Sequence, residues 1–313
     1  MRRFPFLAVV MAAAVIAAVY LIWERAEWRP EEPETRRTPG KETARRPGPA
    51  KKPGRVLAPA PSKSVSPGRQ VAIIIDDIGF DLRIVEELAG IQAPIAFAVL
   101  PYAPHAAESA RLLHAAGKAI LLHLPMEPHA YQAESPGAGA LITDMDEAAI
   151  RRQIRADLAV VPFASGVNNH MGSRFMEDAA RLDVVMDELR RRDLFFVDSR
   201  TTAETRGMAS AGQAGVRFAA RDRFIDHAPG YSAARESLTD FSRPGRGNGA
   251  PLLMIGHPHP ETIRAIRDTL PLWRKEGVRV VPVSACLRIP GSTGEPSRPA
   301  QHDESASERK AFR

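Results

Sequence analysis

Between residues 70 and 287, short and uniformly apolar runs alternate with longer segments whose apolar residues recur at helical spacing. A run without a polar face is typical of a strand that is covered on both sides, as strands of a parallel sheet are. These runs are Val71–Ile75, Ile95–Leu100, Ala119–Leu122, Leu194–Val197, Leu252–Ile255 and Val278–Val283. The alternation predicts an α/β fold in which helices cover a parallel sheet.

The segments between the runs have the period of helices with one buried face. Residues 150–161 place Ile150 and Ile154 on one face, with Asp146 in position to cap the helix, and residues 182–189 and 263–273 repeat the pattern. Some seven or eight strands suit a closed or nearly closed barrel, with a doubly wound open sheet as the alternative. Both arrangements place a functional site at the carboxyl ends of the strands.

Composition divides the chain into four segments. Residues 1–28 contain an uncharged run from Phe4 to Trp23, which is long enough to cross about 30 Å of hydrocarbon. Arg2 and Arg3 precede this run, so we expect an anchor in the inner membrane with the rest of the chain in the periplasm. A cleaved signal peptide is the alternative. Residues 29–69 predict a disordered linker, 70–287 the folded domain, and 288–313 a disordered tail.

The net charge of +6 does not indicate a nucleic-acid partner, because the excess of Lys and Arg lies in the flanking segments and the folded domain is slightly acidic. A basic linker favours contact with an anionic membrane surface or envelope polymer, or is simply solvated. The chain has one cysteine, Cys286, so no disulfide forms within it. Cys286 lies in an apolar stretch and is expected to be buried.

Polar residues gather where the apolar runs end. The first run leads directly into Asp76 and Asp77, and two carboxylates at the end of a buried strand are costly unless they are solvated, paired or bound to a cation. An aspartate here could instead cap the following helix, but Asp81 is placed to do that. The pair therefore favours a functional site, in which one carboxylate binds a metal and the other faces the substrate.

Two further strand ends carry histidine. His123 closes the run at Ala119–Leu122, with Glu127 shortly after it, and His170 follows the adjacent pair Asn168 and Asn169. One carboxylate and two imidazoles make a three-ligand set with a position open for water, which is typical of catalytic Zn²⁺. The two asparagines are candidates for orienting the ligands.

The last two polar strand ends complete the set of candidates. Asp198 and Arg200 follow the run that ends at Val197, and His257 follows the run that ends at Ile255. Hydrolysis by a metal-activated water needs a base for the water and an acid for the leaving group. Asp76 and His257 fit these two roles, and Asp198 or Arg200 is expected to tune His257 or to bind substrate. The other histidines, His259 among them, have no comparable placement.

Five blocks of this sequence, in order, closely resemble the divergent polysaccharide deacetylase family. They are Ile-Asp76-Asp77-Ile-Gly, His123-Leu-Pro-Met-Glu-Pro, Asn168-Asn-His170-Met-Gly-Ser, Phe-Val-Asp198-Ser-Arg and Gly-His257-Pro. The resemblance implies a distorted (β/α) barrel of about seven parallel strands. It also implies that Asp76 is the base, Asp77 a metal ligand and His257 the acid.

One departure concerns the second histidine ligand. The wider polysaccharide deacetylase group has both ligand histidines in one His-x-x-x-His motif, whereas the next histidine after His123 is His129, beyond two prolines. We therefore assign His123 and His170 as the ligands of Zn²⁺ or another divalent transition metal.

The function that this resemblance implies is a metal-dependent hydrolase of the cell envelope that removes acetyl groups from an acetylated glycan. A catalytically weak periplasmic protein that binds glycan or acts as a scaffold is the alternative, and a metal-dependent peptidase or amidase is a third reading. The low aromatic content, 6%, leaves few stacking platforms for sugars and weakens the binding alternative.

Overall fold

The computed structural model describes residues 69–241 and 250–291. The predicted anchor, nearly all of the linker and most of the tail lie outside the described residues. Within the described ranges, no helix combines the length and apolar character that crossing a membrane requires.

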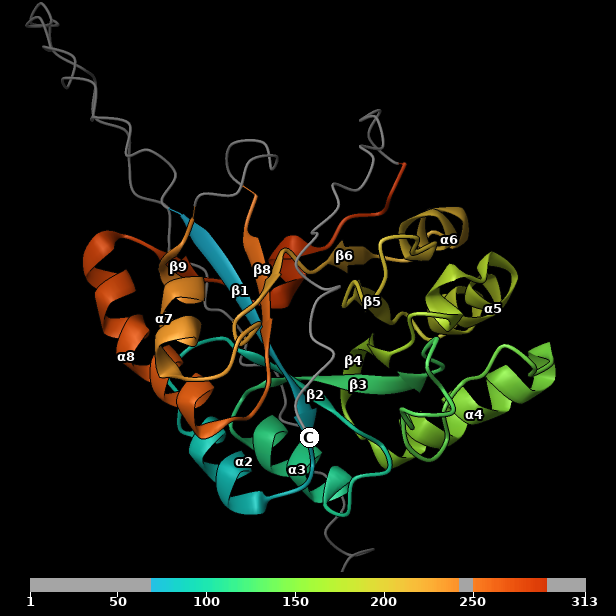
Figure 1. Ribbon diagram of the computed structural model, residues 1–313, viewed down its shortest axis with the longest axis horizontal. Coiled ribbons are helices and arrows are strands. Elements are labelled where there is room, and N and C mark those ends of the chain that lie inside the picture. The colour runs from blue at the N-terminus through green and yellow to red at the C-terminus, as the bar shows by residue number, and fades with distance from the viewer. Residues whose placement is uncertain (1–68, 242–249, 292–313) are drawn as a thin grey trace, which may run out of the picture. The chain divides into compact units, whose positions relative to one another are not determined.

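The elements follow the predicted order of strand and helix (Figure 1). The strands are β1 Gln70–Ile78, β2 Ala96–Val99, β3 Ala119–Met126, β4 Ala164–Met171, β5 Phe195–Asp198, β6 Phe218–Ala220, β7 Arg223–Phe224, β8 Leu252–Gly256 and β9 Arg279–Val280. The helices are α2 Leu82–Ala89, α3 Ala106–Ala115, α4 Glu147–Val160, α5 Ala179–Arg190, α6 Gly207–Ala214, α7 Tyr231–Thr239 and α8 Pro260–Glu276, with 3₁₀ turns η1 Phe175–Glu177 and η2 Val283–Cys286. Asp81 and Asp146 cap α2 and α4 as expected, since each side chain accepts a hydrogen bond from a backbone amide of the first turn.

The sheet is parallel and strongly curled, with the order β6-β5-β4-β3-β2-β1-β8-β7 and with β9 beside the start of β1. From β1 to β6 each strand lies next to its successor, without the reversal of order that defines a doubly wound sheet. The two end strands are consecutive in the chain. Between them, the amide of Arg221 donates to Asp198 O on β5 and the amide of Asp222 donates to Leu253 O on β8. The α/β class and the distorted barrel are therefore confirmed, and the helices lie outside the curled sheet (Figure 1).

Side chains along each strand point alternately to the two faces of the sheet, and they form two separate hydrophobic clusters. On β1, Val71, Ile73 and Ile75 belong to the large cluster between sheet and helices, whereas Ala72 and Ile74 belong to a small cluster inside the barrel. Cys286 joins the inner cluster from η2 and is buried there, as expected. The inner cluster has small residues in several places, which suits the narrow interior of a barrel.

Two details differ from the sequence prediction. The run Val278–Val283 forms only the two-residue β9 before η2. The amides of Arg279 and Val281 donate to Arg69 O and Val71 O, and the next residue that would donate on this side, Val283, already belongs to η2. Conversely, β6 and β7 have three and two residues and are too short to show a period.

Candidate active site

The same alternation of side chains between the two faces of the sheet brings polar side chains from several strand ends together inside the barrel. Ala72 and Ile74 face inward on β1, and Leu121 and Ile255 do so on β3 and β8. Side chains two residues apart on a strand share a face. Asp76, His123 and His257 therefore point inward at the carboxyl end of the barrel, above the apolar inner cluster. On β4, Asn168 and His170 occupy the equivalent face.

Asp77 reaches this interior through an unusual backbone. Its φ of +55° lies in the left-handed region that non-glycine residues rarely adopt. Gly79 follows with φ +127°, and a Cβ atom there would lie 2.6 Å from Ala103 Cβ. Met171 and Arg200, which also lie at or just past strand ends, have φ values of +54° and +52°. Three of the five non-glycine residues with positive φ in the described ranges thus lie at this edge of the barrel, and such strained residues are frequent at functional sites.

Three predicted ligands meet with the spacing of a metal site. His123 Nε2 and His170 Nδ1 each lie 3.2 Å from Asp77 Oδ1, and 3.2 Å from one another. Ligand bonds of 2.0–2.1 Å in a tetrahedron place ligand atoms about 3.3 Å apart, so the triangle fits Zn²⁺. Among the described residues, the buried Asp77 Oδ1 has no hydrogen-bond partner, and a cation would satisfy it.

Asn168 connects the metal ligands to the predicted base. Its Nδ2 donates to Asp76 Oδ1 at 2.8 Å, which leaves its Oδ1 to accept from His123 Nδ1 at 2.9 Å. The proton of His123 is thereby held on Nδ1, and the lone pair of Nε2 faces the triangle. Ligand histidines are commonly oriented through their second nitrogen in this way. Asn168 is fully buried, so the network is shielded from competing water.

The two aspartates of β1 have opposite protonation behaviour. Burial raises the pKa of Asp76 above its ordinary value, although His123 and His257 favour the charged form. Burial also acts on Asp77, but His123 and His170 outweigh it and hold the pKa of Asp77 well below the usual range. An anionic ligand beside a carboxylate with a raised pKa is the division of roles that metal-assisted hydrolysis needs.

His257 is held by a partner that the sequence analysis missed, Asp226. His257 Nδ1 lies 3.0 Å from Asp226 Oδ1, and the amide of His257 donates to Asp226 Oδ2 at 2.7 Å. Burial lowers the pKa of His257, but the hydrogen bond to Asp226 and its charge raise it to about 9. Asp226 follows the apolar pair Phe224 and Ile225 just as Asp198 follows Phe196 and Val197. That repeated pattern was the available signal, but β7 is too short to stand out as a strand.

The remaining predicted residues brace the loops around the site. Glu127 Oε2 accepts from the amide and hydroxyl of Thr143, and Asn169 Oδ1 accepts from the amide of Ser199. Asp198 Oδ1 accepts from the amide of Arg200, whose side chain is exposed. These contacts give Glu127, Asn169 and Asp198 supporting positions, and contact of any of the four with substrate stays a prediction.

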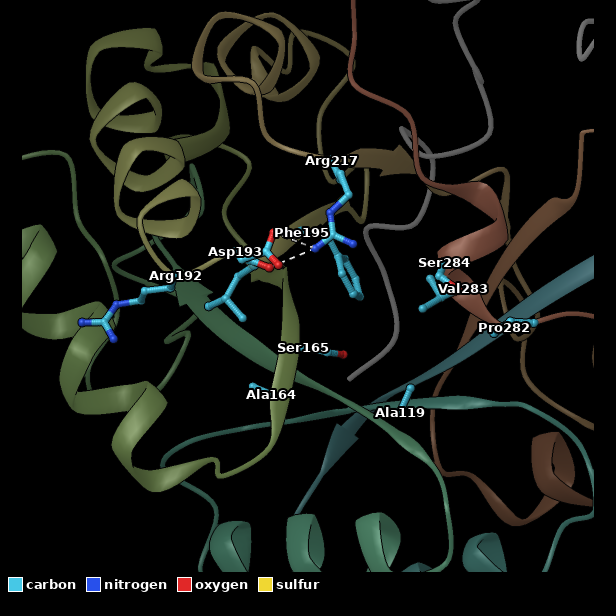
Figure 2. Close-up of a pocket in the computed structure, with 11 residues that line it drawn as sticks. Ala119, Ala164, Ser165, Arg192, Asp193, Phe195, Arg217, Pro282, Val283 and Ser284 are labelled. Atoms are coloured by element: carbon cyan, nitrogen blue, oxygen red, sulfur yellow. Dashed lines mark hydrogen bonds and ion pairs between the residues drawn. The ribbon is translucent and has the colours of Figure 1, made fainter. Parts of the chain in front are cut away.

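A hollow in the surface lies elsewhere. It has a volume of about 450 Å³ and is lined in part by Ala119, Ala164 and Phe195, which lie at the starts of β3, β4 and β5 (Figure 2). Arg217 and Asp193 pair beside it, with 3.1 Å between Nη2 and Oδ1. This hollow is at the amino ends of the strands, whereas ligands of parallel α/β folds bind at the carboxyl ends. We therefore assign no catalytic role to it.

Fold and site together define an α/β barrel protein with a candidate metal centre of one aspartate and two histidines, flanked by an aspartate and a histidine. Residues 73–287 match the family described as divergent polysaccharide deacetylase, and the chain belongs to that family.

Relatives of the chain include two bacterial proteins without an assigned activity. It is 35% identical over 199 residues to the uncharacterized protein YibQ of Escherichia coli (strain K12). The matched residues cover 64% of this chain and 61% of YibQ. It is 30% identical over 222 residues to an uncharacterized protein of Haemophilus influenzae, covering 67% of this chain and 78% of the relative. The chain thus spans less than two thirds of YibQ.

The solved structures include one with the same fold. The crystal structure of the uncharacterized protein ATU2773 from Agrobacterium tumefaciens C58 has a TM-score of 0.66 and 23% sequence identity, and covers 72% of this chain and 91% of that protein.

Proposed function

We propose that this protein is a metal-dependent deacetylase that removes acetyl groups from a glycan of the cell envelope. The triangle formed by Asp77, His123 and His170, with the buried Asp76 on one side and the His257–Asp226 pair on the other, carries the proposal. Membership of the divergent polysaccharide deacetylase family supports an acetylated glycan as the substrate. A periplasmic location with an anchor in the inner membrane, inferred from residues 1–28, belongs to the same proposal.

The residues of the chain divide the reaction between two proton transfers. Asp77, His123 and His170 would hold Zn²⁺ or a similar cation, which would polarise the acetyl carbonyl and lower the pKa of the attacking water. Asp76 accepts the proton of that water, and burial, which raises the pKa of Asp76 above its ordinary value, makes it a stronger base. His257 donates a proton to the departing nitrogen or oxygen. Asp226 keeps the ring of His257 oriented by holding Nδ1.

The test is release of acetate from acetylated chito-oligosaccharides and peptidoglycan fragments by the Zn²⁺-loaded protein. We expect Asp76→Asn and His257→Asn each to lower turnover by about 10²-fold or more, because each removes one proton transfer. Asp144→Asn and His227→Asn change exposed residues and should keep the native rate. Zinc content measured beside the rates shows whether each variant is loaded.

The results separate an enzyme from a binding protein. A zinc-loaded native chain that releases no acetate from any substrate of a broad panel would rule out the deacetylase. Glycan binding that survives Asp77→Ala and His123→Ala would then favour the binding or scaffolding function.

A further inference from the structure

A second group of metal-ligating side chains lies at the same edge of the barrel. Asp226, His257 and His259 bring one carboxylate oxygen and two imidazole nitrogens within 4.8 Å of one another. Over residues 69–241 and 250–291, this group and the triangle around Asp77 are the clusters of three that could hold a metal ion. We propose that Asp226, His257 and His259 form a second, weaker transition-metal site whose occupation withdraws His257 from catalysis.

The backbone presents the two histidines on the same side. They flank Pro258, and the centroids of their rings are 5.9 Å apart. Residues two apart in an extended segment share a face. His259 is exposed at the start of α8 and its side chain makes no capping hydrogen bond to that helix. Its ring can therefore turn toward a cation at no cost to the helix.

The carboxylate of the site is already fixed in place. Asp226 Oδ2 accepts from the amide of His257 at 2.7 Å and from Thr262 Oγ1 at 3.0 Å. These bonds orient Oδ1, which faces His257 Nδ1 at 3.0 Å. The Asp226 side chain is 7% exposed, so a charge on it is poorly solvated. One carboxylate and two imidazoles form a donor set that Zn²⁺ and neighbouring transition metals accept.

The geometry also makes this site the weaker one. His259 is exposed, so its ring must be ordered before it can bind a cation, at a cost in side-chain entropy. The three ligand atoms of the first site lie 3.2 Å apart. A cation at the second site must also replace the proton shared by His257 Nδ1 and Asp226 Oδ1. The first site therefore fills first.

Filling the second site changes what His257 can do. A cation bonded to Nδ1 takes the place of the proton that Asp226 accepts and fixes the ring through a new bond. His257 then cannot form the imidazolium that protonates the departing group, and the Nε2–H that remains is a much weaker acid. This consequence for catalysis rests on the proposed function, whereas binding of the second cation does not.

The experiment is a titration of the chelator-stripped protein with Zn²⁺ against a chromophoric competitor. We expect two steps in the native chain, a tight one and a weaker one, of one equivalent each. His259→Ala should raise the dissociation constant of the weaker step by more than about tenfold, since losing even an outer partner of a ligand costs that much. It should leave the tight step unchanged. His170→Ala should weaken the tight step and leave the weaker step unchanged.

His227→Ala is the matched control, because His227 is an exposed histidine next to Asp226 in the sequence. Both steps should survive that change. A single step in the native chain, or a weaker step that His259→Ala leaves intact, would overturn the second site.

A rate measurement tests the effect on catalysis. Acetate release by the native chain should fall when Zn²⁺ exceeds one equivalent, and release by His259→Ala should not. Equal inhibition of both chains would contradict the role of His257 as a shared residue. If no substrate yields acetate but the two binding steps follow the variants as described, the proposed deacetylase fails and the second metal site stands.

Discussion

At the scale of single residues, Asn168 performs two tasks with its two amide atoms. Its oxygen accepts from His123, a metal ligand, and its nitrogen donates to Asp76, the proposed base. An amide group does both without carrying a charge. The ligand set and the base are therefore held at a fixed distance by one buried side chain.

The two tasks can be separated by substitution. In Asn168→Asp, a carboxylate oxygen still accepts from His123 Nδ1, so we expect zinc affinity to stay within about tenfold of the native value. No donor remains for Asp76, and a second carboxylate now faces it, so turnover should fall by about 10²-fold or more. Asn168→Ala should lower both zinc affinity and turnover. A competition titration with Zn²⁺ and the rate of acetate release check the two effects. Native turnover in Asn168→Asp would contradict the bridging role.

At the scale of elements, strand length decided how much of the site the sequence could predict. β1, β3 and β8 are long apolar strands, so Asp76, His123 and His257 could be placed at their carboxyl ends from the sequence alone. β7 has two residues and no visible period, so Asp226 was missed. The left-handed turn at Asp77 was also beyond prediction, because it depends on how the loop after β1 packs against the loop after β2.

Gly79 tests that packing of loops. In Gly79→Ala the new Cβ would meet Ala103 Cβ at 2.6 Å, and φ there is +127°. We expect a loss of about 2–3 kcal/mol in the free energy of unfolding, together with weaker zinc binding, because Asp77 lies two residues before Gly79 at the end of β1. Gly117→Ala is the control, since φ is +73° there but nothing lies within 4 Å. It should cost about 1 kcal/mol and leave zinc affinity unchanged. Urea denaturation measures the free energy of unfolding, and zinc titration measures the affinity for the metal. Equal zinc affinity in Gly79→Ala and Gly117→Ala would contradict the proposal that packing at Gly79 positions Asp77.

At the scale of the whole molecule, the barrel interior combines an apolar base with a polar end. Small apolar side chains such as Ala72 fill the base, and the charged groups sit above them at the carboxyl ends of the strands. Burying these charges opposes folding unless each has a partner. His257 and Asp226 partner one another, so their ion pair links the stability of the whole chain to pH.

The sign of this pH dependence follows from the raised pKa of His257, about 9 in the folded chain against about 6.5 when unfolded. Its stabilising contribution is complete below pH ~6.5 and is lost as pH rises through about 9. With metal removed, the native chain should lose about 2–3 kcal/mol more in free energy of unfolding between pH 6 and pH 9.5 than Asp226→Asn does, because the variant has no ion pair to lose. Urea denaturation at the two pH values provides the comparison, with His227→Asn expected to behave as the native chain does. If the native chain and Asp226→Asn lost stability in parallel, the Asp226–His257 pair would not be what couples folding to pH.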